Sequence, residues 1–284
     1  MKTIHRIAAA MLLLTTLIAC NFLSQAPAAP SIPTDTPIAA ASPTEIPIPT
    51  AKPTEIPALP PTPTSLPLYQ TVTLGENTVE DSGKAPDFTL KAVTPILQGS
   101  NDPRVEKFNQ LVATRVQQAV ETFKKDLANQ PATPISAGSY FSLNYALISP
   151  SGNLLSLQIH IEGYSDGAAH PYHLTSSFNY DLENGQEISL DQLFLPGTDY
   201  LKTISGYCMA ELSKRNIGFE MFSDGAKPAP ENYTVWNVSA DGLVITFNEY
   251  QVAAYAAGPQ EVVIPFAVLK EFSNPQDPLN TFKK

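Results

Sequence analysis

A short segment of the chain carries side chains that could bind a metal ion. His170 and His173, with Asp166 nearby, offer two imidazoles and a carboxylate, and these are ligands that zinc takes in proteins. No helix is predicted here to place both histidines on one face, and His160 is expected on the polar face of a strand. A turn that leads into a strand is therefore the favoured interpretation, with a zinc site as the alternative. We predict no metal and no cofactor.

The other polar residues do not combine into a predicted catalytic centre. The sequence contains neither a His-Glu-x-x-His motif nor a glycine-rich loop of the kind that holds phosphates. Asp181 and Glu183 flank a turn, where solvated charge is the usual explanation. Because no nucleophile, base and oxyanion donor can be assembled, we predict no catalytic residues and expect that the protein is not an enzyme.

The tract from Glu249 to Gly258 combines small residues with two tyrosines and little charge. Tyrosine buries a large area at a low entropic cost, so such a surface suits contact with a ligand. The same residues could instead line the core or order a long loop, and both interpretations stay open. The best candidates for a contact region are four polar aromatic residues: His170, Tyr172, Tyr250 and Tyr255.

The N-terminal segment predicts a lipid modification. Lys2 and Arg6 precede an apolar run from Ile7 to Ala19, which is shorter than the roughly 20 residues of a spanning helix and is typical of an export signal. Cys20 follows at once and supplies a thiol for a diacylglyceryl group. We expect a protein anchored by lipid to the extracytoplasmic face of the cell membrane. An ordinary secretory signal, with Cys20 present by chance, is the alternative.

Composition separates a linker from the folded part and excludes some partners. Nearly every third residue from about 26 to 67 is proline, so this stretch cannot bury a core and should form an extended, disordered stalk. The formal net charge of the chain is −10. A chain this acidic is a poor candidate for binding nucleic acid, where Lys and Arg clusters supply the affinity, and it would suit a basic partner.

Two hydrophobic periods indicate the elements that position the candidate residues. Apolar residues recur at steps of three and four from Asp102-Pro103 to about Ala128, which predicts an amphipathic helix capped by the aspartate. Alternation with period two then predicts three half-buried antiparallel strands, carried by these residues: Phe141, Leu143, Tyr145 and Leu147; Leu155, Leu157, Ile159 and Ile161; Leu174, Ser176, Phe178 and Tyr180.

The C-terminal part repeats this order. A second helix is predicted from about Asp199 to Arg215, with Cys208 as a buried thiol on its apolar stripe, and further strands near residues 234–238, 243–247 and 261–264. The order of helix, three strands, helix and three strands predicts an α+β fold, a two-layer sandwich of helices on antiparallel sheets after a disordered Pro-rich linker.

An ordered series of short motifs resembles a known family. The sequence is similar to the RsiV-like C-terminal domain family at the following segments: Gly167-Ala168-Ala169-His170-Pro171, Phe178-Asn179-Tyr180-Asp181-Leu182, Ile188-Ser189-Leu190, Phe247-Asn248-Glu249-Tyr250 and Val263-Ile264-Pro265. The region before them resembles the companion domain that usually precedes it. Members include the extracytoplasmic part of RsiV-type anti-sigma factors, which bind lysozyme, and an accessory region of PdaC-type deacetylases.

These inferences give one predicted organisation. The expected parts are a signal peptide at residues 1–19, a lipidated Cys20 and stalk at 20–67, a companion domain at 68–165 and the RsiV-like domain at 166–284. The resemblance implies a membrane-anchored binding or sensor domain that recognises a lysozyme-like protein or peptidoglycan. The alternative is a cell-wall-modifying enzyme or an accessory module of one.

Overall fold

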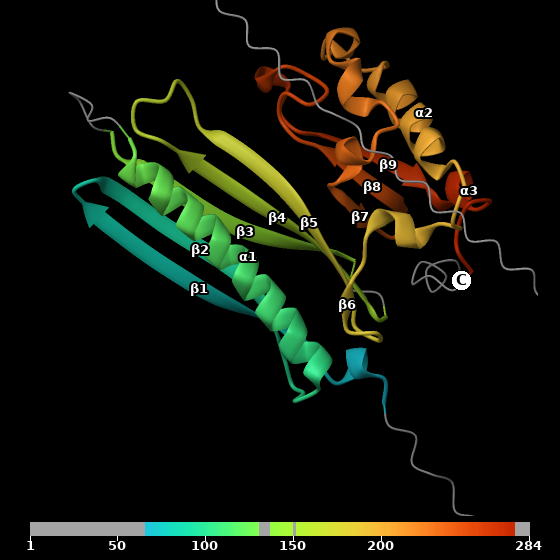
Figure 1. Cartoon of the computed structure of the whole chain (residues 1–284), viewed down its shortest axis with the longest axis horizontal. Coiled ribbons are helices and arrows are strands. Elements are labelled where there is room, and N and C mark those ends of the chain that lie inside the picture. Colours follow the sequence, from blue (N-terminus) through green and yellow to red (C-terminus); the bar gives the residue numbers. More distant parts are fainter. Residues whose placement is uncertain (1–65, 131–136, 150–151, 276–284) are drawn as a thin grey trace, which may run out of the picture. The chain divides into compact units, whose positions relative to one another are not determined.

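The computed structural model of the protein describes residues 66–130, 137–149 and 152–275. These residues form two β-sheets, each of which packs against a helix (Figure 1). The predicted α+β class and the sandwich of helices on sheets are confirmed. The predicted signal peptide and Cys20 lie outside the described residues, as does the stalk up to residue 65.

The first sheet has six strands, which lie side by side in chain order: β1 (Thr73–Lys84), β2 (Asp87–Gln98), β3 (Ser139–Ser149), β4 (Leu154–Tyr164), β5 (Tyr172–Asp181) and β6 (Gln186–Glu187). The β2–β3 pair is parallel and the other neighbouring pairs are antiparallel. The parallel pair arises because α1 (Pro103–Ala128) connects the two strands, and parallel neighbours require such a crossover. The alternating stripes of β3, β4 and β5 are confirmed, whereas the β1–β2 hairpin was not predicted.

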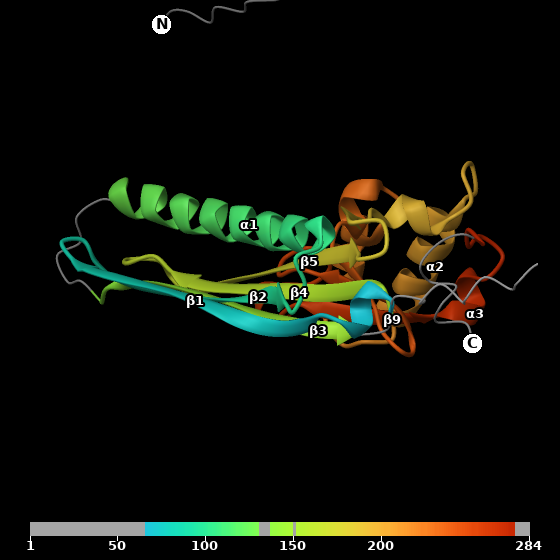
Figure 2. The ribbon, with the colours of Figure 1, turned by 90° about the horizontal axis from the view of Figure 1, so that it is seen from below.

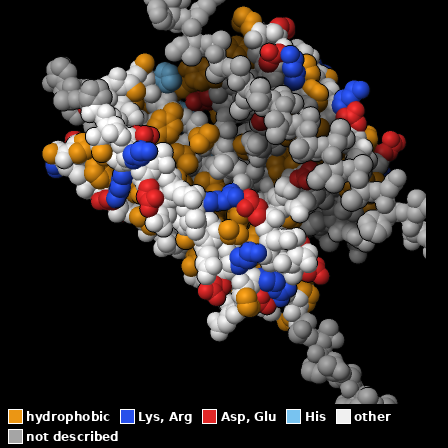
Figure 3. Space-filling model, in the orientation of Figure 1, with side chains coloured by type: hydrophobic (Ala, Val, Ile, Leu, Met, Phe, Trp, Pro, Cys, Tyr) orange, Lys and Arg blue, Asp and Glu red, His pale blue; other side chains and the backbone are white. Residues whose placement is uncertain are grey.

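Helix α1 covers one side of this sheet, which we call the helix face (Figure 2). Its predicted N-cap is confirmed, since the Asp102 side chain accepts a hydrogen bond from the Arg104 amide and Pro103 occupies the first turn. Phe108 is fully buried, and its ring centroid lies 5.4 Å from that of Phe178 and 5.3 Å from that of Tyr180. The outer side of α1 carries charged side chains of both signs (Figure 3).

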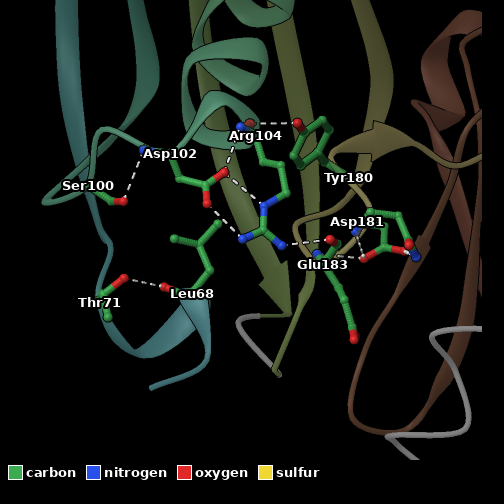
Figure 4. A network of polar contacts seen from close by, with 9 residues as sticks. Leu68, Thr71, Ser100, Asp102, Arg104, Tyr180, Asp181 and Glu183 are labelled. Carbon is green, nitrogen blue, oxygen red and sulfur yellow. Dashed lines mark hydrogen bonds and ion pairs between the residues drawn. The ribbon is translucent and has the colours of Figure 1, made fainter. Parts of the chain in front are cut away.

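Arg104 ties the start of α1 to the turn between β5 and β6 (Figure 4). Its guanidinium donates to both carboxylate oxygens of Asp102, at 2.8 and 2.7 Å, and to the Glu183 carbonyl oxygen at 2.7 Å. The Tyr180 hydroxyl donates to the Arg104 carbonyl oxygen at 2.6 Å. These bonds to the charged carboxylate lower the pKa of Asp102 to about 2. These bonds therefore fix the position of the N-terminus of α1 relative to the end of β5.

The second sheet and its helices form a separate hydrophobic core. It contains β7 (Trp236–Val238), β8 (Gly242–Phe247) and β9 (Gln260–Pro265), all antiparallel, with α2 (Tyr200–Leu212) and α3 (Phe266–Leu269) packed on it. Cys208 of α2 is fully buried in this core, as predicted, and burial raises the pKa of its thiol to about 12. A thiol in this state is structural and not nucleophilic.

The two sheets divide after Glu187, because β5 and β6 continue the first sheet. The domain boundary expected between residues 165 and 166 falls in the connection between β4 and β5, two neighbouring strands of that sheet. Among the described residues, no helix has both the length and the apolar character needed to span a bilayer.

Candidate functional site

The side of the six-stranded sheet opposite α1 is polar, and we call it the polar face. Successive side chains of a strand point to opposite faces, so the residues between the apolar stripes of β3, β4 and β5 all lie here. Their paired positions across the strands are the following: Asn144 with His160, Ser142 with Glu162, His160 with Thr175, Glu162 with His173, and Ser156 with Asn179.

One end of the polar face is sealed by hydrogen bonds to the second sheet. The Ser156 hydroxyl donates to Asn179 Oδ1 at 2.6 Å, and Asn179 Nδ2 donates to the Trp236 carbonyl oxygen at 2.8 Å. Asn237 Nδ2 donates to Ser156 Oγ at 3.0 Å, while Gln158 Nε2 donates to Glu261 Oε1 at 2.9 Å. The two sheets are thus joined by a network of polar side chains, in which Asn237 Oδ1 is the one buried side-chain oxygen or nitrogen without a partner among the described residues.

The loop after β8 is fixed to the edge of this face by Asn248. Its side chain accepts from the Thr175 amide at 2.7 Å and donates to the Thr175 carbonyl oxygen at 2.9 Å, so it pairs with β5 as a neighbouring strand would. Tyr250 follows with a φ of 64°, and it is the one non-glycine residue with positive φ among those described. Such a conformation is uncommon outside glycine and recurs at functional sites.

A pocket of about 420 Å³ opens where this loop meets β3, β4 and β5. His160, Glu162, His173 and Glu249 contribute its titratable side chains, and no Lys or Arg is among its lining residues. His173 Nδ1 lies 2.8 Å from Glu249 Oε1, and the Glu249 side chain is only 9% exposed. The pocket wall therefore carries two carboxylates and two imidazoles.

Three aromatic residues lie together beside this pocket, and we call them the aromatic stack: His170, Tyr250 and Tyr255. The rings of His170 and Tyr255 are stacked with centroids 3.9 Å apart, and the Tyr250 and Tyr255 centroids are 5.8 Å apart. The Tyr255 hydroxyl donates to the Pro171 carbonyl oxygen at 2.9 Å, which fixes the ring. The Tyr255 and His173 centroids are 6.4 Å apart, so the stack adjoins the pocket wall.

Tyr172, the fourth candidate from the sequence, does not join the stack. It precedes His173 in β5 and pairs with Gly163 on the helix face, where a side chain on Gly163 would overlap the Tyr172 ring. Burial, with a smaller contribution from Asp126 of α1, raises the pKa of its hydroxyl. Tyr172 therefore belongs to the opposite side of the sheet.

The alternative zinc site is not assembled by this geometry. His170 Nδ1 lies 2.8 Å from its neighbour's carbonyl oxygen and Nε2 lies 3.3 Å from the Tyr250 hydroxyl, while His173 is paired with Glu249. Asp166 accepts a hydrogen bond from the Ala137 amide. In the described part of the chain, no three His, Cys, Asp or Glu side chains gather as metal ligands would.

Sequence reasoning missed several residues of this site. Glu249 was seen only as the start of a low-charge tract, and Glu162 was not singled out, although period two places it on the same face as His160. It also passed over the segment Gly163-Tyr164-Ser165-Asp166-Gly167, which has the Gly-x-Ser-x-Gly spacing of esterase nucleophiles. Here that segment comprises the last two residues of β4 and the start of the connection to β5, not the strand-to-helix elbow in which such a serine is activated.

Comparison with known proteins relates the C-terminal part to one family. Residues 191–267 match the family model described as "Protein of unknown function (DUF3298)". The chain is 24% identical over 174 residues to the peptidoglycan-N-acetylmuramic acid deacetylase PdaC of Bacillus subtilis, a match that covers 60% of this chain and 37% of the deacetylase. It is 32% identical over 111 residues to an esterase of Mycobacterium tuberculosis, covering 36% and 48% respectively. These matches span less than half the length of each relative.

Two solved structures share the fold. A member of the DUF3298 family from Bacteroides fragilis superposes with a TM-score of 0.58 and 19% identity, covering 75% of this chain and 97% of that one. A DUF3298 protein from Pseudomonas aeruginosa gives a TM-score of 0.52 and 13% identity, covering 72% and 95%. The family match, the deacetylase relative and these folds bear out the resemblance inferred from the sequence.

Proposed function

We propose that this protein binds a glycan of the cell wall in the pocket beside the aromatic stack. The observation that carries the proposal is the concave pocket of about 420 Å³, in which imidazoles and carboxylates lie next to stacked aromatic rings. Pockets of this size accept small ligands or a short stretch of polymer. Aromatic faces pack against the C–H groups of a sugar ring, and carboxylates and imidazoles hydrogen bond to its hydroxyls.

A lysozyme-like protein is the other partner that the resemblance implies, and the acidic chain would suit a basic protein. A stable protein interface buries about 800 Å² on each partner and is not defined by one pocket. The glycan is therefore the better match to this geometry, and lysozyme serves as the competing ligand in the assay.

The test is binding of the full-length protein to purified peptidoglycan and, separately, to lysozyme. Replacing Tyr250 or Tyr255 with alanine should weaken peptidoglycan binding by about 1–2 kcal/mol, as expected for an aromatic anchor, with the melting temperature measured on the same samples. Tyr69→Ala is the matched control, because Tyr69 is also exposed but lies in the short turn before β1. Binding to lysozyme without binding to peptidoglycan would contradict the proposal, as would an equal loss in the control.

The proposed location is the outer surface of the cell membrane, with Cys20 as the lipidated residue. Support comes from the export signal and the small residue that precedes the cysteine. Cys20→Ser should move the protein from the membrane fraction to the soluble one. A variant that stays membrane-bound at unchanged mobility would show that the anchor lies elsewhere.

Hydrolysis of a cell-wall bond, alone or as part of a larger enzyme, is a second candidate function. It is supported by the esterase relative and by His173, which Glu249 holds at 2.8 Å in the way that an acid orients a histidine base. Release of acetate from peptidoglycan should then be lost in His173→Asn. Activity that persists in this variant would show that His173 is not the base, and absence of turnover in the unaltered protein favours binding alone.

A further inference from the structure

We propose that the pocket selects amino sugars whose nitrogen is a free ammonium over their N-acetylated forms. This inference rests on the proposed glycan-binding function and specifies its ligand. It follows from the charge of the pocket wall and from the position of each carboxylate beside His173.

The two carboxylates are brought together from elements far apart in the chain. Glu162 of β4 lies directly opposite His173 of β5 in the antiparallel register. Glu249, from the loop after β8, reaches the same histidine with Oε1 at 2.8 Å from Nδ1 and Oε2 at 3.3 Å from the backbone amide. One imidazole is thus flanked by two carboxylates on the same face of the sheet.

Both carboxylates are held in place and keep hydrogen-bonding capacity. The Tyr140 hydroxyl donates to Glu162 Oε1 at 2.8 Å, and Glu162 is exposed to solvent along the pocket. A carboxylate has about four acceptor sites, so neither group is saturated by these bonds. A ligand that enters the pocket therefore meets acceptors and needs donors of its own.

The wall contains no Lys or Arg side chain to balance these acceptors. An ammonium group brings three donors and a positive charge, and hydrogen bonds between charged groups are roughly twice as strong as neutral ones. An acetamide brings only one N–H donor and no charge, and its carbonyl oxygen gains nothing from the two carboxylates. The chemistry of the wall therefore favours the free amine.

The aromatic stack next to His173 offers ring faces to the same ligand. The Tyr255 ring adjoins His173, with centroids 6.4 Å apart, and its exposed neighbour Tyr250 extends the aromatic surface. A hexosamine ring packed on these faces would lie beside the carboxylates, and the aromatic faces also attract a cation.

The experiment compares two probes with the full-length protein: a glucosamine oligomer and an N-acetylglucosamine oligomer of equal length, at about 0.15 M salt so that long-range attraction is screened. We expect the glucosamine oligomer to bind about tenfold tighter. Glu162→Gln, which keeps the side-chain shape, should reduce this ratio to about one. Glu220→Gln is the matched control, because Glu220 is exposed and does not line the pocket, and the ratio should persist in it.

Each other result overturns the inference. Equal or tighter binding of the acetylated oligomer excludes selection of the amine, and a ratio that persists in Glu162→Gln places the selection elsewhere. An equal loss in Glu220→Gln would show that only the overall charge matters. If neither oligomer binds but peptidoglycan does, the inference fails and the proposed function stands. If peptidoglycan does not bind either, both fail.

Discussion

The two faces of the six-stranded sheet are built from the same strands and have opposite chemistry. On the helix face, alternate residues of β4 and β5 such as Leu157, Phe178 and Tyr180 are almost fully buried against α1. On the polar face, the residues between them, such as Ser156 and Asn179, hydrogen bond to the second sheet, and His173 lines a pocket. Because side chains alternate along each strand, the residues that stabilise the fold lie on one face and the residues of the candidate site lie on the other.

The two faces contribute to the structure through different interactions. Apolar burial is non-directional and contributes most of the folding free energy. Buried hydrogen bonds contribute only about 1 kcal/mol each, but they are costly when one partner is lost. We therefore expect the helix face to determine whether the protein folds, and the polar face to determine how the second sheet and its loop are oriented.

Phe108→Ala should give the largest loss of stability. It removes a fully buried ring that contacts Phe178 and Tyr180, and such truncations cost about 3–5 kcal/mol. Chemical denaturation followed by circular dichroism measures the change. A loss below about 1 kcal/mol would mean that the helix face is not the main source of stability.

Asn179→Ala should cost less, about 1–3 kcal/mol, because it leaves the Ser156 hydroxyl and the Trp236 carbonyl oxygen without their partner. Gln118→Ala on the exposed side of α1 is the control, with an expected change within about 0.5 kcal/mol. If Asn179→Ala were as stable as Gln118→Ala, the polar contacts between the sheets would contribute nothing to stability. The contrast drawn between the helix face and the polar face would then be wrong.

Asp102→Asn should have a smaller effect that depends on pH. The Asp102 pKa is lowered from 3.8 to about 2, because the Arg104 side chain and amide bond to the charged form. A carboxyl whose pKa is lower in the folded state stabilises the protein above its unfolded pKa, and the contribution is lost as the pH falls through the folded pKa. The variant should therefore melt at a lower temperature than the unaltered protein at pH 7, and the two should converge as the pH falls from about 4 to 2. A constant difference across this range would show that the charge of Asp102 is not the cause.

Tyr172→Ala and His173→Asn should differ in binding more than in stability. The two residues are adjacent in β5 and lie on opposite faces. Each side chain is partly exposed but has a contact to lose, the Tyr172 ring over Gly163 and the His173 pair with Glu249, so we expect similar losses of about 1 kcal/mol in the free energy of unfolding. Only His173→Asn should weaken peptidoglycan binding. An equal loss of affinity in Tyr172→Ala would show that the site extends around the sheet edge to the helix face.

The strands and helices that carry a clear period were predictable from the sequence, and so was the capped start of α1. The β1–β2 hairpin was not predicted, because β1 lies at the sheet edge and alternates neither in polarity nor in burial, and because the alternation that β2 does show from Phe88 to Thr94 was missed. The position of Tyr172 could have been read from the apolar stripe of Leu174, Phe178 and Tyr180, since period two places it on the same face.

The sequence indicated only that His170, Tyr250 and Tyr255 lie in loops. It did not indicate that the three residues lie close together. The contact between His173 and Glu249 joins residues 76 positions apart, and it depends on how the second sheet meets the first. No local pattern encodes that arrangement. The Gly163–Gly167 segment shows that a local pattern can also mislead. Its spacing matches a catalytic motif, whereas its position between two paired strands does not match the geometry of that motif.

The edge strand β1 bears on whether copies of this protein associate through their sheets. No strand of the described residues pairs with the outer edge of β1, which is twelve residues long, and such an edge would ordinarily invite self-association, in which edges of neighbouring copies join into a continuous sheet. Glu76, Glu80 and Asp81 place charged side chains along this strand, where Lys91 pairs with Glu80 and Lys124 pairs with Asp81. Charged side chains on an edge strand disfavour pairing with a second edge. Copies of this protein at high local concentration are therefore not expected to polymerise through their sheets.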